Sequence, residues 1–371
     1  MNKETLGLYI HIPFCVKKCN YCDFCSFPSK KEVYSQYVNA LCEQIGAQRE
    51  DPRPVDSVFF GGGTPSLLSE GDFSRIFAAL REKYAFCEDA EITVEANPGT
   101  VTKKKLSALR SLGVNRLSMG LQSAEDTELA LLGRIHTYAD FLESYRAARE
   151  AGFQNINIDL MFAIPGQTLK SLEKTLSCVL SLRPSHISAY GLIIEEKTPF
   201  GRQRESLALP GDDAEAQMYD LICKTLGDSG YLHYEISNFA MQGKQCRHNL
   251  RYWQGGDYLG FGLAAHSLYK GERLEMTEDM TAYLSDPASV LACVERSAED
   301  EREEYIMLGL RTSFGISLSE YRRRFGADFL AGREQKLSLY RRLGYLSFDG
   351  DRVFLTERGF FVSNALLCEL I

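Results

Sequence analysis

No stretch of this 371-residue sequence reaches the roughly 18 consecutive apolar residues that a membrane-spanning helix requires. The first residues also lack the charged start and the apolar segment of a secretory signal peptide. Both absences argue against an anchored or a secreted protein. We therefore expect a cytoplasmic protein without a membrane anchor, in a compartment that keeps cysteine thiols reduced.

The sequence also lacks an excess of positive charge. Its 42 lysines and arginines are outnumbered by 50 aspartates and glutamates, which gives a net charge of −8 at pH 7. A general nucleic-acid-binding surface needs the opposite balance. Two short basic runs, 103–105 and 322–324, are interpreted as solvated helix faces. We therefore expect no nucleic-acid partner.

Eleven cysteines are present, but their spacing fits neither a disulfide framework nor two paired zinc-binding motifs. No C-x2-C pair occurs outside one dense group near the N-terminus. Seven cysteines are scattered singly and are interpreted as structural thiols, namely Cys42, Cys87, Cys178, Cys223, Cys246, Cys293 and Cys368.

The dense group contains Cys15, Cys19 and Cys22, spaced by three and two residues directly after a short β-patterned segment. A 4Fe-4S cluster is normally held by four cysteine thiolates, so a group of three leaves one iron for an exogenous ligand. S-adenosylmethionine is the natural candidate for that ligand. Cys25 is an alternative fourth ligand that would close the cluster and restrict it to electron transfer, and we interpret it as a spare thiol.

Short apolar runs alternate with amphipathic stretches of helical length up to about residue 240, a pattern typical of βα units. Six units predict an α/β fold with a partial, six-stranded (β/α)6 barrel. The predicted strands are Gly7–Ile12, Ser57–Phe60, Ile92–Glu95, Arg116–Gly120, Asn157–Phe162 and His186–Leu192. The predicted helices include Glu32–Arg49, Phe73–Tyr84, Lys103–Leu112 and Tyr138–Glu150.

Polar residues follow nearly every predicted strand, where the chemistry of such barrels collects. The second strand leads into the glycine-rich loop 61–66, which allows a ligand to approach the backbone closely. Glu95, Gln122 and Asp159 lie at or near the ends of later strands, and Arg134 follows in a loop. Together they predict a polar ring suited to a zwitterionic cofactor that carries a ribose.

The composition changes beyond residue 240. Glycine and aromatic residues dominate to about residue 270, and an acidic stretch follows at 297–304. We interpret 241–296 as an extension and a linker. Residues 297–371 then show helical patterns at 303–310, 317–325 and 329–343 and a hairpin at 345–355, which predicts a smaller α+β domain resembling a winged helix. We expect it to act as a lid or as a partner-docking element rather than to bind DNA.

The sequence resembles the radical S-adenosylmethionine superfamily along nearly its whole length. Within it, the chain is similar to the branch of oxygen-independent coproporphyrinogen III oxidase, and in particular to its heme-chaperone relatives called HemW. The segments that carry this resemblance are Tyr-Ile-His-Ile-Pro-Phe-Cys at 9–15, Tyr-Cys-Asp-Phe at 21–24, Gly-Gly-Gly-Thr-Pro-Ser at 61–66, Gly-Leu-Gln-Ser at 120–123, Asp-Leu-Met-Phe-Ala-Ile-Pro-Gly-Gln-Thr at 159–168 and His-Asn-Leu-Arg-Tyr-Trp at 248–253.

The resemblance implies a radical S-adenosylmethionine barrel over 1–240 and a HemN-like C-terminal domain over 297–371. It also implies a 4Fe-4S cluster held by Cys15, Cys19 and Cys22. The S-adenosylmethionine site that it implies consists of Tyr9, Tyr21, Gly62, Gly63, Thr64, Glu95, Gln122, Arg134 and Asp159.

Two functions fit this resemblance. The first is a heme chaperone that binds heme and delivers it to acceptor respiratory hemoproteins, some of them membrane-associated. The alternative is an enzyme, the oxidase that decarboxylates propionates to give protoporphyrinogen IX. The oxidases carry a further cysteine where this chain has Phe24, and an N-terminal extension where only eight residues precede Tyr9. These differences favour the chaperone; a homodimer remains an open alternative.

A heme-binding protein needs an axial ligand or an apolar slot, and the chain has only six histidines. His248 is the heme-ligand candidate because Tyr252 and the single tryptophan, Trp253, follow it closely. The alternative is a hydrogen-bonded histidine that fixes its loop, and Cys246 is a second candidate ligand. His11 is expected near the cluster and His266 near S-adenosylmethionine, whereas the remaining histidines are interpreted as structural, namely His136, His186 and His233.

Overall fold

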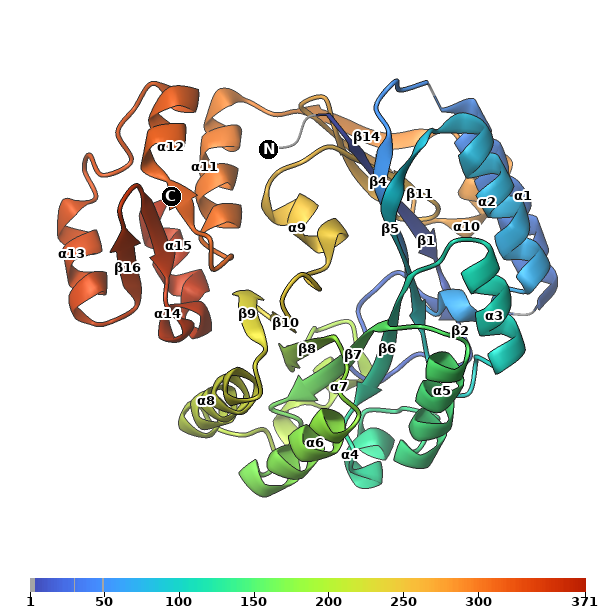
Figure 1. Ribbon diagram of the computed structural model, residues 1–371, viewed down its shortest axis with the longest axis horizontal. Helices are drawn as coiled ribbons and strands as arrows, with labels where there is room; N and C mark the ends of the chain where they lie inside the picture. The colour runs from blue at the N-terminus through green and yellow to red at the C-terminus, as the bar shows by residue number, and fades with distance from the viewer. Residues whose placement is uncertain (1–3, 30, 49) are drawn as a thin grey trace.

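The structure is a computed structural model that describes residues 4–29, 31–48 and 50–371. Within this part of the chain, a twelve-stranded sheet has the order β14-β13-β12-β11-β1-β4-β5-β6-β7-β8-β10-β9. Six consecutive neighbours are parallel and carry the predicted βα units (Figure 1). They are β1 (Leu6–Ile12), β4 (Val55–Gly62), β5 (Phe86–Ala96), β6 (Arg116–Gln122), β7 (Asn155–Phe162) and β8 (His186–Gly191).

Helices cover the outer face of this sheet (Figure 1). Several begin with a capping box, in which the N-cap hydroxyl and the side chain three residues later satisfy each other's backbone N–H groups, as at Ser69, Thr137 and Thr168. The helices are α1 (Lys31–Ala47), α2 (Glu70–Lys83), α3 (Lys103–Ser111), α4 (Asp126–Leu131), α5 (Tyr138–Glu150), α6 (Leu169–Ser181) and α8 (Asp212–Asp228). The predicted end of the first helix at Arg49 lies outside the described residues.

The predicted α/β class and six parallel strands are confirmed, with strand ends displaced by up to six residues. Apolar side chains pack between the sheet and the helices, as with Leu8, Val58 and Leu106. The inner side of the sheet is partly polar. There, Asn157 donates a hydrogen bond to Asp159 (2.7 Å), and its side-chain oxygen contacts Nδ1 of His186 (2.6 Å).

The segment 241–296 is not the linker that its composition indicated. It forms α9 (Arg247–Trp253), β11 (Tyr258–Phe261), β12 (His266–Tyr269), β13 (Glu272–Met276), α10 (Met280–Ser285) and β14 (Val290–Glu295). β11 pairs in parallel with β1, and the three later strands extend the sheet as an antiparallel ribbon. These strands are short and mostly lack β-branched residues, and the partner that places β11 in the sheet, β1, lies about 250 residues earlier in the chain.

The C-terminal region begins with a helix that, with its N-cap, includes the acidic stretch 297–304. Ser297 caps α11 (Ala298–Gly309), and acidic residues suit the first turn of a helix because they face its positive end. The remaining elements are α12 (Leu318–Phe325), α13 (Glu334–Arg342), α14 (Glu357–Phe361), α15 (Ser363–Leu370) and the three-stranded sheet β15-β17-β16, formed by Ile316–Ser317, Arg352–Leu355 and Leu346–Asp349. Helices followed by a small antiparallel sheet agree with the predicted winged-helix-like arrangement.

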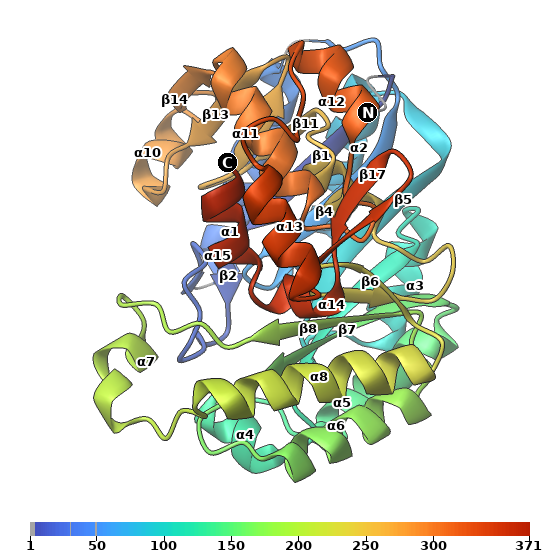
Figure 2. The ribbon, with the colours of Figure 1, turned by 90° about the vertical axis from the view of Figure 1, so that its left-hand side faces the viewer.

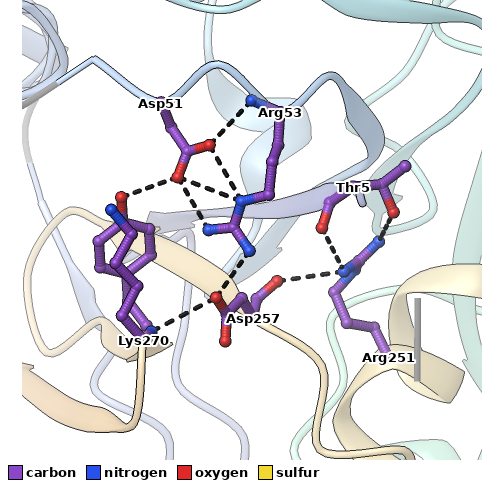
Figure 3. A network of polar contacts seen from close by, with 7 residues as sticks. Thr5, Asp51, Arg53, Arg251, Asp257 and Lys270 are labelled. Carbon is purple, nitrogen blue, oxygen red and sulfur yellow. Dashed lines mark hydrogen bonds and ion pairs between the residues drawn. The ribbon is translucent and has the colours of Figure 1, made fainter. Parts of the chain in front are cut away.

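A polar network joins the start of the chain to α9 and β11 (Figure 3). Arg251 forms an ion pair with Asp56 and donates hydrogen bonds to the backbone and side chain of Thr5 and to the carbonyl group of Asp257. Arg53 joins Asp257 to Asp51 in the same network. The network therefore fixes α9 against the amino ends of β1 and β4.

Replacement of Arg251 by methionine is expected to lower the free energy of unfolding by about 3 kcal/mol, because the side chain is buried and Asp56 and Thr5 would lose their partner. Arg247→Met is the matched control on the same helix. Its partner Asp89 is mostly exposed, so the expected change is below about 1 kcal/mol. Urea denaturation of both variants checks this, and equal losses would contradict the structural role of Arg251.

Candidate active site at the cluster loop

The three clustered cysteines lie on a loop that begins at the carboxyl end of β1. This loop is framed by a short parallel pair, β2 (Phe14–Cys15) and β3 (Phe27–Pro28). Nε2 of His11 donates a hydrogen bond to the carbonyl oxygen of Cys25 (2.8 Å). The backbone N–H of Asn20 donates a hydrogen bond to the carbonyl oxygen of Leu132 (2.9 Å). The loop is thus attached both to the first strand and to the end of α4.

A cavity of about 590 Å3 opens beside this loop at the carboxyl ends of the parallel strands. It brings together all of the predicted cluster and cofactor residues except Tyr9 and His248. They are Cys15, Cys19, Tyr21, Cys22, Gly62, Gly63, Thr64, Glu95, Gln122, Arg134 and Asp159. The cavity therefore lies where the polar residues at the ends of the predicted strands indicated.

Two of the thiols receive polar contacts from the barrel. Oγ1 of Thr64 lies 3.6 Å from Sγ of Cys15, and Nη1 of Arg134 lies 3.6 Å from Sγ of Cys19. Asn97 holds both donors in place, because it donates to Thr64 (2.8 Å) and accepts from Arg134 (2.6 Å). Both groups are donors that can hydrogen-bond to the sulfur atoms of a bound cluster.

The glycines of the loop 61–66 are required by close contacts. A Cβ atom on Gly63 would lie 2.7 Å from the carbonyl oxygen of Phe14, and one on Gly62 would lie 2.5 Å from the ring of His11. Gly62 also has a positive φ of 107°, which favours glycine. These glycines allow the end of β4 to lie close to the cluster loop. This close packing explains the two glycines even if no ligand contacts them.

Two carboxyl groups face the cavity from β5 and β7. Burial, and then the negative charge of Asp159, raise the pKa of Glu95 to about 8. Burial also raises the pKa of Asp159, although hydrogen bonds from Asn157, Ser188 and Ser118 oppose the shift. Adjacent carboxyl groups that resist ionisation are suited to a positively charged ligand, which would stabilise their ionised forms.

Gln122 has a positive φ of 75°, an uncommon conformation for a residue other than glycine and one that is found at functional sites. Sequence reasoning gave no role to Asn97 or Ser118, which also line the cavity. Asn97 directly follows the strand that ends near Glu95, so the same strand-end signal could have found it. Ser118 lies mid-strand and carried no such signal.

Comparisons with known proteins extend these observations. The sequence model of the Radical SAM superfamily matches residues 9–179, and that of the HemN C-terminal domain matches 297–362. The Escherichia coli coproporphyrinogen III oxidase HemN, described as a radical SAM enzyme, superposes with a TM-score of 0.85 at 25% identity over 99% of this chain and 90% of its own. Heme chaperone HemW of Escherichia coli K12 is 41% identical over 70% of this chain and 69% of its own.

Heme chaperone HemW of Bacillus subtilis is 37% identical over 96% of both chains. This chain belongs to the HemW family of radical SAM proteins. Membership implies a 4Fe-4S cluster and S-adenosylmethionine, and the cavity fits both. Three thiols converge on it, and the buried Nε of Arg134 has no hydrogen-bond partner in the described structure, so the site offers a donor for an acceptor on a bound group.

His248 does not have the surroundings of a heme ligand in this HemW-family chain. Its side chain is 1% exposed, and both ring nitrogens are engaged, Nδ1 with Ser57 (3.1 Å) and Nε2 with Tyr252 (2.8 Å). Burial, and then the charges of Arg251 and Arg116, lower its pKa to about 3. The alternative of a hydrogen-bonded histidine that fixes its helix is therefore the better interpretation, and the fully buried Cys246 is no more accessible.

Tyr9 is also placed differently from the expectation. It lies inside the barrel, where its ring stacks against those of His248 and Phe59 and its hydroxyl contacts Nδ1 of His11 (3.0 Å). His266 does not line the cavity, whereas His136 does. His11 was expected near the cluster, and its ring is hydrogen-bonded to the carbonyl oxygen of Cys25 in the cluster loop.

An apolar rim surrounds the mouth of the HemW-family cavity. The residues that form it line the cavity and are each more than half exposed, namely Val16, Phe24, Ile135 and Ile193. Exposed apolar groups gathered at one opening indicate a binding surface. In the described chain no residue of 297–371 lines the cavity, so the lid expected of this region is not observed. No helix among the described residues is long and apolar enough to cross a membrane.

Proposed function

We propose that this chain is a heme chaperone that carries a 4Fe-4S cluster and S-adenosylmethionine and delivers heme to acceptor hemoproteins. The observation that carries the proposal is the similarity to proteins named heme chaperone HemW, which extends over 96% of the chain. The acceptors that we propose are respiratory hemoproteins, some of them bound to membranes.

Cys15, Cys19 and Cys22 are the proposed cluster ligands. The bound cluster supplies one-electron chemistry at S-adenosylmethionine. The barrel residues orient the cofactor: Glu95 and Asp159 offer carboxylates to its positive or hydroxyl groups, and Arg134 balances the negative charge of the thiolates. This division of roles requires no residue of the C-terminal region.

Heme is proposed to bind on the apolar rim formed by Val16, Phe24, Ile135 and Ile193. A flat macrocycle buries apolar surface there, and Lys17, which also lines the cavity, can pair with a propionate group. This location is favoured over His248 because the rim is exposed, whereas both nitrogens of His248 are occupied.

The test uses anaerobically reconstituted, cluster-loaded protein, assayed for heme binding and for turnover of coproporphyrinogen III with S-adenosylmethionine and a reductant. Stoichiometric heme binding without turnover is expected. The structural similarity to the oxidase supports the second candidate function, and conversion to protoporphyrinogen without stable heme binding would establish that candidate instead.

The heme location predicts that Phe24→Ser combined with Ile193→Ser weakens heme binding about tenfold or more, because two exposed apolar contacts are lost. Leu291→Ser is the matched control, since Leu291 is similarly exposed on β14 and does not line the cavity. Heme titration followed by absorbance measures both. Equal heme affinities of the double variant and the control would show that heme does not bind on the rim.

A further inference from the structure

Three side chains with metal-ligating atoms converge where the barrel meets the C-terminal region. Cys223 comes from α8, His233 from β9 (Leu232–Glu235) and Glu357 from the first turn of α14. Nδ1 of His233 lies 3.9 Å from Sγ of Cys223 and 3.9 Å from Oε1 of Glu357. All three ligand atoms lie within 4.8 Å of one another. Figure 2 shows α14 above α8, with which it packs.

We propose that Cys223, His233 and Glu357 bind a zinc ion at this junction, with water as the fourth ligand. Sulfur, imidazole and carboxylate are all zinc ligands, at about 2.3 Å for sulfur and about 2.0–2.2 Å for nitrogen and oxygen. Tetrahedral coordination then separates the ligand atoms by roughly 3.3–3.6 Å. The two measured separations need to shorten only slightly to reach that range.

His233 is already oriented as a ligand. Its Nε2 faces the carbonyl oxygen of Ile236 at 3.4 Å, and because a carbonyl group only accepts, Nε2 must carry the proton. The lone pair is therefore on Nδ1, which faces the thiol and the carboxylate. A metal-binding histidine commonly donates its second nitrogen to a backbone carbonyl group in this way. Burial lowers the pKa of His233 to about 4, which keeps the ring neutral.

Aromatic rings pack around His233 and beside Cys223. The ring of His233 stacks on Phe239 at 4.1 Å and meets Phe360 edge-on at 5.1 Å. Tyr219 packs against Phe361 at 5.2 Å, and its buried hydroxyl interacts with the Cys223 thiol. That hydroxyl is available to the thiolate or to the metal-bound water.

A cation would also satisfy the charges at this site. The Cys223 thiol loses its proton when it binds the ion. Zinc replaces that proton, which passes to solvent, and the cation lies between the thiolate and the carboxylate. The ion would tie α8 and β9 of the barrel to α14 of the C-terminal region.

The test uses the full chain with its iron-sulfur cluster loaded, incubated with zinc and dialysed. One zinc ion per chain is expected, and zinc-edge X-ray absorption should show one sulfur ligand together with nitrogen and oxygen ligands. Zinc taken up by vacant cluster cysteines would instead show about three sulfur ligands. The spectrum therefore distinguishes the proposed site from misloading.

Cys223→Ser should abolish zinc retention, while Cys368→Ser, which changes an exposed cysteine of α15, should retain one zinc ion. Glu357 is largely exposed, so Glu357→Gln should fold normally and weaken zinc binding at least tenfold in a chelator competition. Unchanged affinity in Glu357→Gln, or a wild-type protein that retains no zinc or only sulfur-rich zinc, would overturn the proposal. The triad would then be an S–H···N hydrogen bond with a neighbouring carboxylate.

Discussion

Replacement of Cys19 by serine is expected to remove the 4Fe-4S cluster, reducing the iron content from about four atoms per chain to less than one. Sγ of Cys19 lies in the cavity with the other two thiols, 3.6 Å from Nη1 of Arg134. With two thiolates left, the cluster would lose a third of its protein ligands, because no other thiol lines the cavity in the described chain. Iron analysis and the visible absorbance of anaerobically reconstituted protein measure this loss.

Cys25→Ser is the matched control, since Cys25 belongs to the same loop but does not line the cavity. It should keep a full cluster. Loss of iron in both variants would mean that four protein thiolates close the cluster, leaving no iron for S-adenosylmethionine. The protein would then be an electron-transfer protein rather than a chaperone with an open cluster.

The affinity for S-adenosylmethionine is expected to rise about tenfold per pH unit between pH 6 and 8 and to level off above pH 8. In the free protein Glu95, with a pKa of about 8, carries a proton at neutral pH. The sulfonium and ammonium groups of the ligand favour the ionised carboxylate, so binding releases that proton. Isothermal titration in buffers of different ionisation enthalpy measures both the affinity and the proton release.

Glu95→Gln should remove this pH dependence and weaken binding, whereas Glu195→Gln, an exposed residue of the same cavity, should leave it unchanged. Stability should change in the opposite sense. Because folding raises the pKa of Glu95, its contribution to stability is complete below the unfolded pKa of about 4.3 and is lost as pH rises through 8. The ligand-free Glu95→Gln protein should therefore melt higher than wild type at pH 9, and a lower melting temperature would contradict this.

The sequence predicted what short-range patterns encode. Alternating apolar runs located six parallel strands, and polar residues at their ends located the cavity, because parallel strands bring their carboxyl ends to one side. Glu95, Gln122 and Asp159 were found in this way without knowledge of the fold.

Patterns that depend on distant partners were not predictable. Trp253 and Tyr252 suggested a flat apolar surface around His248. In the structure the His248 side chain is buried and hydrogen-bonded to Ser57, which is far away in the sequence. Cys223 was interpreted as a scattered structural thiol and His233 as a structural histidine, and no sequence spacing links either of them to Glu357. Their proximity arises only when α14 packs on α8.

The pairing of β1 with β11 has a consequence for synthesis of the chain. β1 holds the cluster loop, yet one of its edges is covered only by Tyr258–Phe261, which are translated long after it. Arg251, which fixes the start of β1, is translated equally late. A nascent barrel that ends before residue 258 therefore exposes an unpaired strand edge, the kind of surface that chaperones shield from aggregation. The sheet edge at β1, and with it a stable binding site for the iron atoms, is therefore completed only after most of the polypeptide has left the ribosome.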